Sequence, residues 1–425
     1  MEKAKTKYKI NFSMERVLNV SDRAYTLFEE QQKARGINLE QVKTKLKALK
    51  IETPSWGYGD SGTRFKVFKK ESVARNPFEK FEDAAQVHRL TRLCPSVAIH
   101  IPWDKVDDYG KLKSHAESLG LAIGAVNPNL FQEDEYMLGS VTNSDPAIRR
   151  KATEHLLECV DIAKETGSPD LSLWFADGTN YPGQGDIRKR KAWMFEALSE
   201  MYKAMTPQMR MLIEYKCFEP AFYHTDLADW GMAYNYALKL GPQAEVLVDT
   251  GHHAQGTNVE HIVAYLIDEK KLGGFHFNSR KYADDDLIVG SMNPYELFLI
   301  FYQILNASKD SDAGILQTVD NIAYMIDQSH NIEPKIPAMI RSLLNVQTQY
   351  AKALLVNHAE VEEAQQRNDV LAAEDAVRQA FEFDVTPLLH AVREEQGLPL
   401  DPMKAYLDSS YGKDILARGK GGASW

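Results

Sequence analysis

Cysteine is scarce in this chain of 425 residues, which contains only Cys94, Cys159 and Cys217. Their spacings match no CxxC or zinc-ribbon pattern, which argues against both a structural zinc site and a disulfide framework. Unpaired thiols are typical of the reducing cytosol, so we expect a cytoplasmic protein. The charged N-terminal stretch is followed by no apolar segment and therefore does not resemble a secretory signal.

Long apolar runs and an excess of positive charge are also missing. No apolar run is longer than LFLIFY (297–302), far short of the ~20 residues that a membrane-spanning helix needs. Lys and Arg number 50 against 60 Asp and Glu, so the net charge is −10. A negative chain has no global field to attract nucleic acid or an anionic membrane. We therefore expect neither partner, and a small neutral or cationic ligand instead.

What the chain does have is a regular alternation of short apolar strands and amphipathic helices, which is typical of parallel βα units. The alternation begins near residue 51 and predicts eight strands at 54–58, 96–101, 121–126, 171–175, 211–215, 245–250, 273–278 and 323–327. Eight such units favour a closed (β/α)8 TIM barrel over an open sheet. No GxGxxG or GKS/GKT phosphate-binding loop follows any strand, which counts against nucleotide binding.

The remaining segments predict helices outside the barrel. Residues 1–50 form an N-terminal helical segment, with Gly36 at the end of the first helix and Asn38 at the start of the second. Residues 51–335 form the catalytic barrel and residues 336–425 a C-terminal helical arm. We expect the final stretch, RGKGGASW (418–425), to be frayed.

Ionisable residues stand at the ends of four consecutive predicted strands: Glu214, Asp249, His276 and Asp327. In barrels of this kind, chemistry is found at the carboxyl ends of the strands. A single buried Glu or His is more often a satisfied core residue than a ligand. Three carboxylates at close quarters, however, repel one another and are costly to bury without a cation between them. One imidazole and three carboxylates suit Mn²⁺, Mg²⁺ or Co²⁺ better than structural zinc.

A second group of candidate ligands lies beside the first. His252 follows Asp249 by three residues, and the loop after the seventh strand carries three consecutive acids, of which the alternate pair Asp284 and Asp286 could join His252 around a second cation. An isolated run of three acids is more often a solvated loop. Lys216, just beyond the fifth strand, could hydrogen-bond a substrate oxygen, although a surface lysine is the simpler interpretation.

Aromatic residues and a further histidine fall at or just after other strand ends: Trp56, His100, Phe131 and Trp174. Such residues belong to the core about as often as to a binding site. At a barrel mouth beside polar groups, they predict a pocket that grips the C–H faces of a sugar.

Nine separated motifs together resemble the L-rhamnose isomerase family, specifically its broad-specificity bacterial branch that also isomerises D-allose. They are, in order, PSWG, GTRF, HIPWD, DGTNYPGQ, EYKCFEPAFY, VDTGHHA, GGFHFN, YADDDL and MIDQSHN, and the resemblance covers about residues 50–360. It implies a xylose-isomerase-like barrel, two divalent cations per subunit, most often Mn²⁺ with Co²⁺ or Mg²⁺ possible, and a homotetramer. Two departures are Tyr215, where a histidine is familiar, and Ser279 with Arg280, where an acid is familiar.

The resemblance also implies roles for residues. Glu214, Asp249, His276 and Asp327 would hold the cation that anchors the substrate, and His252, Asp284 and Asp286 would hold the catalytic one. Lys216, His100 and Asp327 would act in catalysis. This set leaves His253 without a ligand role, and we expect it to support the site or to pack in the turn. The residues implied to line the sugar pocket are Trp56, Phe65, His100, Phe131, Trp174 and Lys216, with Phe65 reaching into a neighbouring subunit's site.

The function implied is interconversion of L-rhamnose and L-rhamnulose, and of aldoses such as D-allose, by a metal-assisted hydride shift. Three alternatives stay open. A ketose 3-epimerase of the same superfamily would need one metal and two glutamates, which would leave His252 and its acidic partners superfluous. A metal-dependent nuclease is disfavoured by the negative charge. A non-catalytic sugar-binding protein would make the full set of ligands a coincidence.

Overall fold

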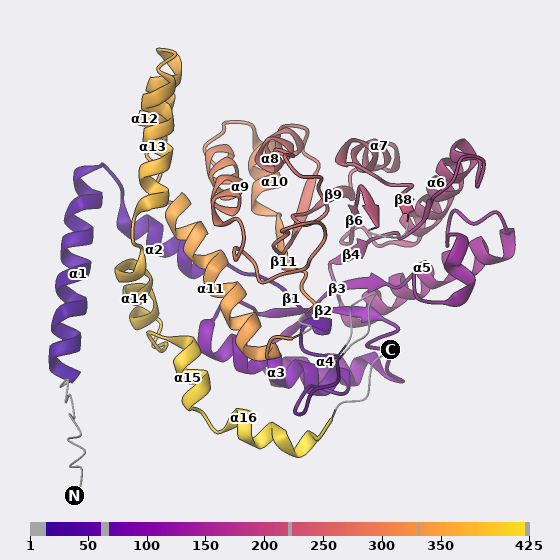
Figure 1. Cartoon of the computed structure of the whole chain (residues 1–425), viewed down its shortest axis with the longest axis horizontal. Coiled ribbons are helices and arrows are strands. Elements are labelled where there is room, and N and C mark those ends of the chain that lie inside the picture. The colour runs from indigo at the N-terminus through magenta and orange to yellow at the C-terminus, as the bar shows by residue number, and fades with distance from the viewer. Residues whose placement is uncertain (1–13, 61–67, 220–222, 330–331, 421–425) are drawn as a thin grey trace, which may run out of the picture. The chain divides into compact units, whose positions relative to one another are not determined.

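The structure is a computed structural model that describes residues 14–60, 68–219, 223–329 and 332–420. Contacts divide the chain into two compact units, one of residues 49–350 with 401–425 and one of residues 1–48 with 351–400. The larger unit contains the barrel (Figure 1). Its strands are β1 (Thr53–Pro54), β2 (Ser96–Ile101), β3 (Ala122–Pro128), β4 (Asp170–Leu173), β6 (Arg210–Glu214), β9 (Ala244–Asp249), β10 (Leu272–Phe277) and β11 (Ala323–Ile326).

These eight strands form one parallel sheet in the order β1-β2-β3-β4-β6-β9-β10-β11. The first and last strands meet at Glu52, whose N–H donates to the carbonyl of Tyr324 (2.8 Å) and whose carbonyl accepts from Ile326 (2.9 Å). These two bonds bring the ends of the sheet together into a barrel. The predicted (β/α)8 TIM barrel is therefore confirmed, and each predicted strand overlaps one observed strand.

The first strand differs most from its prediction. The sequence predicts a strand over 54–58, but β1 stops at Pro54 and the chain turns into a 3-10 helix, η1 (Ser55–Gly57). The turn is closed by the N–H of Tyr58, which donates to the carbonyl of Ser55 (3.0 Å). Gly57 packs closely against Met339, since a Cβ at position 57 would lie 2.7 Å from the Cε atom of Met339 and would displace the end of that side chain. Tertiary contacts, which the local apolar pattern does not report, decide this turn.

Helices follow the strands along the chain. In the barrel unit these are α3 (Pro77–Thr91), α4 (Tyr109–Ser118), α5 (Pro146–Thr166), α6 (Ile187–Ala204), α7 (Trp230–Leu240), α8 (Val259–Asp268), α9 (Pro294–Ala307) and α10 (Ala313–Asp320), and α11 (Lys335–Ala353) begins there. Helix α5 shows why they form where they do. The Asp145 side chain caps its N-terminus, Pro146 takes the first helical position, and Gly167 ends it at φ +76°.

A small antiparallel sheet follows some of the barrel strands. It has the order β5-β8-β7 and consists of β5 (Gly178–Thr179), β7 (Phe218–Glu219) and β8 (Tyr223–Thr225). Another short element, the 3-10 helix η2 (Asp134–Leu138), follows β3. These short elements follow the carboxyl ends of β3, β4 and β6. They therefore lie at the end of the barrel where active sites form.

The smaller unit is helical and consists of α1 (Met14–Ala34), α2 (Leu39–Ala48), α12 (His358–Gln366), α13 (Val370–Glu382), α14 (Thr386–Glu395) and the end of α11. As predicted, Gly36 has a positive φ (+76°) after α1, and the Asn38 side chain accepts from the N–H of Gln41 at the start of α2 (3.2 Å). Segments distant in the sequence are joined by the ion pair of Lys43 and Glu395 (2.7 Å).

The C-terminal segment does not follow the predicted arm of residues 336–425. Residues 401–420, with α15 (Pro402–Asp408), α16 (Tyr411–Asp414) and the 3-10 helix η3 (Ile415–Arg418), group with the barrel unit. Arg418 was expected to be frayed, but its Nη1 atom lies 2.9 Å from Oδ1 of Asp83 on α3, and the hydroxyl of Tyr411 also donates to Asp83 (2.8 Å). Among the described residues, no helix combines the length and apolar character needed to cross a membrane.

Candidate active site

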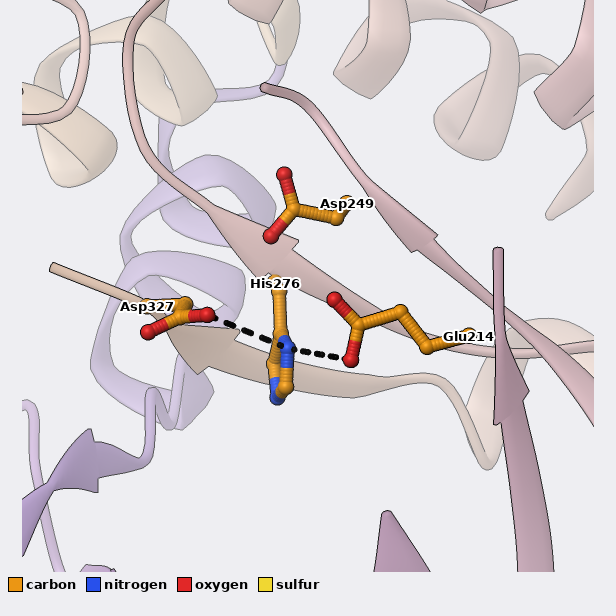
Figure 2. Close-up of side chains that lie close together, drawn as sticks. All are labelled: Glu214, Asp249, His276 and Asp327. Atoms are coloured by element: carbon orange, nitrogen blue, oxygen red, sulfur yellow. Dashed lines mark ion pairs between the residues drawn. The ribbon is translucent and has the colours of Figure 1, made fainter. Parts of the chain in front are cut away.

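Four of the predicted metal ligands meet at the carboxyl ends of neighbouring barrel strands. They come from β6, β9, β10 and the residue after β11, and are Glu214, Asp249, His276 and Asp327. One ligand atom of each lies within 4.8 Å of the others. Figure 2 shows the His276 ring between two of the carboxylates, its Nδ1 atom 3.1 Å from Glu214 and 3.7 Å from Asp327. Parallel pairing explains the convergence, because β10 places His276 opposite Asp249 of β9.

Burial makes this cluster unfavourable without a cation. Burial, together with repulsion from Glu214, raises the pKa of Asp249 to about 7. Burial by itself would lower the pKa of His276, but the carboxylates of Glu214 and Asp327 outweigh it and raise that pKa to about 10. The Oε1 atom of Glu214 is buried and lies 3.2 Å from Nδ1 of His252, but it accepts no hydrogen bond among the described residues. An imidazole and three crowded carboxylates therefore fit a divalent cation, which would neutralise the repulsion.

A second group shares one ligand with the first. Ligand atoms of Asp249, His252 and Asp284 lie within 4.8 Å of one another. The carbonyl oxygen of Tyr215 can only accept a hydrogen bond, so Nδ1 of His252 donates to it (3.0 Å). That bond leaves Nε2 facing the carboxylates, 3.6 Å from Asp284 and 4.0 Å from Asp249. An imidazole oriented by a backbone carbonyl in this way is a typical metal ligand.

The acidic loop places alternate acids differently from the one between them. Asp284 and Asp286 both border the cavity, and burial together with the nearby Asp284 charge raises the pKa of Asp286 well above its usual range. Asp286 also has a positive φ (+47°), which is uncommon for a side chain other than glycine and is found at functional sites. Asp285 also borders the cavity, but its carboxylate accepts from the N–H groups of Lys281 (2.5 Å) and Tyr282 (2.7 Å). Asp285 thus shapes the loop that carries the other two.

Lys216 is buried, not a surface lysine. It is 2% exposed, and its Nζ atom donates to Glu219 (2.6 Å) and to Asp284 (2.6 Å). The same atom lies 5.0 Å from the centre of the Trp174 ring. A cation held between two carboxylates at the cavity is well placed to donate a hydrogen bond to a bound ligand.

Aromatic rings form one wall of a cavity of about 470 Å³. The His100 ring stacks on Trp103 (3.9 Å between centroids) and contacts the edge of Trp56 (5.5 Å). Phe131 contacts His100 (5.8 Å) and Trp174 (4.8 Å). Trp56 also donates its Nε1–H to Asp327 (2.8 Å), which joins the wall to the candidate metal ligands.

The structure thus brings together every predicted site residue that it describes, and Phe65 lies outside the described residues. Asp286 borders the cavity but belongs to neither ligand group. The cavity also contains residues that the sequence analysis did not single out, including Trp103, Asn127, Glu219 and Tyr223. Trp103 and Glu219 lie within the motifs HIPWD and EYKCFEPAFY, which the sequence pointed to without assigning a role to either residue.

His253 lies outside both ligand groups. Its Nε2 atom is 2.6 Å from the hydroxyl of Tyr215, the residue that departs from the familiar histidine. Burial, with the nearby charge of Arg280, lowers the pKa of His253 to about 3, so the ring is neutral and accepts a hydrogen bond from the tyrosine hydroxyl. Arg280 belongs to the other departure, where an acid is familiar. Its side chain donates to Glu296 on α9 (3.0 Å).

Fold and site together define a class: a (β/α)8 barrel with buried acids and histidines suited to divalent cations, beside a cavity sized for a small molecule.

Comparison with known proteins agrees with this class. The family described as "Xylose isomerase-like TIM barrel" matches residues 87–296. Two relatives match almost the whole chain. A probable sugar isomerase of Rhizobium meliloti (strain 1021) is 42% identical over 93% of this chain and 92% of its own. A probable sugar isomerase of Mesorhizobium japonicum is 40% identical over the same shares.

This degree of identity over this length shows that the chain belongs to the family of these two proteins, within the xylose isomerase-like TIM barrels. Solved structures agree on the fold alone. The apo 3-keto-D-glucoside 4-epimerase from E. coli superposes with a TM-score of 0.52 at 14% identity, covering 71% of this chain and 99% of its own. An L-ribulose 3-epimerase gives a TM-score of 0.51 at 14% identity, covering 73% and 98%.

Proposed function

We propose that the protein is a metal-dependent isomerase that interconverts an aldose and a ketose. The observation that carries the proposal is the pair of ligand groups that share Asp249 at the edge of an aromatic-walled cavity. Two adjacent cations beside a cavity of this size suit a small substrate with a carbonyl and neighbouring hydroxyl groups. The two relatives at 42% and 40% identity, each named a probable sugar isomerase, support a sugar as that substrate.

The proposed substrate is L-rhamnose, with L-rhamnulose as product, and aldoses such as D-allose are secondary substrates. The nine collinear motifs that resemble the L-rhamnose isomerase family support this choice. The proposed cations are two Mn²⁺ per subunit, because carboxylate-rich sites with one imidazole suit Mn²⁺, with Co²⁺ and Mg²⁺ as substitutes. The proposed assembly is a homotetramer.

The chemistry follows from the charges around the cavity. In the proposed reaction, the hydrogen on C2 of the open-chain aldose moves as hydride to C1, and a proton passes from O2 to O1. Divalent cations at the two ligand groups would polarise the carbonyl and lower the pKa of the adjacent hydroxyl. The chain's own residues must then bind the sugar, orient it and exclude water.

Particular residues suit each of these tasks. Lys216 would hydrogen-bond the sugar oxygen on which negative charge develops, because its ammonium group is already fixed between two carboxylates at the cavity. Trp56, His100, Phe131 and Trp174 would pack on the C–H face of the sugar and keep water from the reacting carbons. Asp327 would link both parts, since it accepts from Trp56 and faces His276.

A ketose 3-epimerase is the second candidate, because the solved structures that share the fold include sugar epimerases. At 14% identity this likeness concerns the fold alone. The group of Asp249, His252 and Asp284 favours isomerisation, since it offers a second cation site that epimerisation at one metal would not use.

Product analysis tests the proposal. The purified protein is treated with a chelator, reloaded with Mn²⁺, Co²⁺ or Mg²⁺, and incubated with L-rhamnose, D-allose, D-xylose and the corresponding ketoses. The proposal expects ketose from L-rhamnose at the highest rate, only when a cation is present. Conversion of a ketose to its C3 epimer with no aldose formed would favour the epimerase, and binding without turnover would favour a sugar-binding protein.

A further inference from the structure

An ion pair that the proposed chemistry does not use lies buried behind the aromatic wall. Nζ of Lys80, on α3, lies 2.7 Å from Oδ1 of Asp104, and both side chains are 0% exposed. Burying two opposite charges removes them from water at a cost that their mutual attraction often fails to recover. A well-packed apolar pair is often as stable or more stable in such a position. Stability alone therefore does not account for this pair.

The hydrogen bonds of Asp104 indicate what the pair does. Its Oδ2 atom accepts from the backbone N–H of His100 (2.8 Å) and from the hydroxyl of Ser55. The backbone N–H of Asp104 also donates to the carbonyl of His100 (2.8 Å). Asp104 therefore bonds to both the N–H and the carbonyl of His100 at the end of β2. One carboxylate thus ties η1, the end of β2 and α3 together through Ser55, His100 and Lys80.

The residues that it ties together carry the aromatic wall. Trp56 follows Ser55 directly, and its ring contacts the His100 ring (5.5 Å). Trp56 also donates to Asp327, a candidate metal ligand (2.8 Å). A shift of the η1 turn would therefore move both an aromatic face of the cavity and the orientation of a carboxylate in the first ligand group.

We propose that the buried Lys80–Asp104 pair positions the sugar-binding wall, and that Asp104 and Lys80 are positioning residues that touch neither sugar nor cation. Asp104 fixes the wall through its hydrogen bonds to Ser55 and His100, and Lys80 fixes the carboxylate. The inference rests on the proposed isomerase function, since it assigns the wall of that same site.

Two double variants separate positioning from stability. In Lys80→Met with Asp104→Leu, an apolar pair replaces the ions, and the buried donors of Ser55 and His100 lose their acceptor, which offsets the gain from removing two buried charges. KM then rises at least about tenfold, with kcat reduced less, because the displaced wall contacts the sugar less well, and a misplacement of ~1 Å in a positioned site can cost ~100-fold. In Lys80→Met with Asp104→Asn, the carboxamide still accepts from His100, and KM stays within about threefold of the wild type.

Control variants keep the test decisive. Lys105→Met removes an exposed lysine that pairs with Glu158 at 2.8 Å, and its KM equals that of the wild type. If the apolar double variant does not fold, Ser55→Ala removes one of the donors to Asp104, and the expected result is a raised KM at an unchanged melting temperature. A wild-type KM in a folded apolar double variant, or in Ser55→Ala where that variant takes its place, overturns the proposal.

A metal titration distinguishes failure of this inference from failure of the function. If the wild type turns over no aldose, the proposed function fails, and the variants are compared by Mn²⁺ titration of the chelator-treated proteins in a calorimeter. Weaker Mn²⁺ binding in the apolar double variant than in the amide variant supports positioning, because Trp56 would no longer orient Asp327. Equal Mn²⁺ affinity in both overturns it.

Discussion

At the residue scale, two neighbouring histidines have opposite environments. Burial lowers the pKa of His252, but the carboxylates of Asp249 and Asp284 outweigh burial and raise it to about 9. Burial lowers the pKa of His253 to about 3, and its neutral ring accepts a hydrogen bond from the hydroxyl of Tyr215. Adjacent positions in VDTGHH therefore have different contacts: the His252 ring faces the candidate metal ligands, and the His253 ring bonds to Tyr215.

Substitution of each histidine by asparagine separates these roles. His252→Asn loses a proposed metal ligand, so kcat falls by at least about 100-fold and one of two bound Mn²⁺ ions is lost. His253→Asn removes only support for the turn, so activity falls by about tenfold and both ions remain. Steady-state kinetics and metal analysis by mass spectrometry measure both effects. Full activity in His252→Asn would contradict the two-cation site.

The site residues could be predicted from sequence because strand order brings strand ends together. Glu214, Asp249 and His276 each end or nearly end an apolar strand, and neighbouring parallel strands place their ends side by side. Glu219 could not be assigned in this way, since its position depends on a hydrogen bond to Lys216 within a three-stranded sheet that no local pattern indicates.

The electrostatics of the ligand groups predict how cation binding depends on pH. With no cation, the pKa values of His252 and His276 are raised to about 9 and about 10 by the adjoining carboxylates, against the effect of burial. An imidazole that binds a cation must first lose its proton. At a pH below these pKa values, Mn²⁺ therefore competes with protons for the two rings and releases protons when it binds. Mn²⁺ affinity therefore rises as the pH is raised from 6 towards 9. Calorimetry in buffers of different ionisation enthalpy checks this, and a pH-independent affinity without proton release would contradict it.

At the element scale, the acidic loop after β10 is organised by its central residue. The Asp285 carboxylate accepts from three successive backbone N–H groups, those of Lys281, Tyr282 and Ala283. The alternation of the three acids predicted that Asp284 and Asp286 could join His252 around a cation, and the structure groups Asp284 with His252 while Asp286 borders the cavity outside that group. The alternation did not predict that Asp285 would fold the loop, because a run of acids is equally compatible with a solvated turn.

Replacing Asp285 tests this arrangement. Asp285→Ala removes the acceptor, so the loop loses its turn and Mn²⁺ at the group containing Asp284 binds at least about tenfold more weakly, as for loss of an outer-shell partner. Asp285→Asn keeps a carboxamide acceptor and serves as the matched control, with binding near that of the wild type. Mn²⁺ titration that resolves two sites provides the measurement. Equal weakening of both sites in Asp285→Ala would show that the loop does not serve one site selectively.

The strands also show what a local pattern can predict. Apolar runs placed β2 at residues 96–101, where the structure has it. The same approach placed a strand over 54–58, where the chain turns after Pro54. The turn depends on Ser55 and Trp56 bonding to Asp104 and Asp327, which are distant in the sequence. Long-range polar bonds of this kind carry no signal in periodicity.

At the scale of the whole molecule, the barrel was predictable and the division of the remaining helices was not. Eight units, each a strand followed by a helix, are the number that a closed parallel barrel needs, so their count and order in the sequence predict the barrel. The helical pattern after residue 332 did not reveal that residues 401–420 belong with the barrel unit while residues 351–400 group with the N-terminal helices. Long-range pairs such as Arg418 with Asp83 hold residues 401–420 on the barrel unit, and no local pattern indicates them.

Removal of the cations should destabilise the barrel as a whole. The ligand groups join four strands, and a cation held only by the folded state at 1,000 times its Kd stabilises it by about 4 kcal/mol. Chelator treatment should therefore lower the melting temperature by several degrees, and added Mn²⁺ should restore it. Differential scanning calorimetry measures the change, with the His252→Asn variant expected to show a smaller decrease. An identical melting temperature with and without Mn²⁺ would contradict the proposed cation sites.

The fate of a labelled hydrogen tests the central claim most directly. L-rhamnose carrying deuterium at C2 is incubated with the Mn²⁺-loaded protein in ordinary water, and the ketose is examined by nuclear magnetic resonance. A hydride shift between C1 and C2 predicts L-rhamnulose with deuterium retained at C1. Exchange of the label with water, or failure to form any ketose while the protein binds Mn²⁺, would contradict the account.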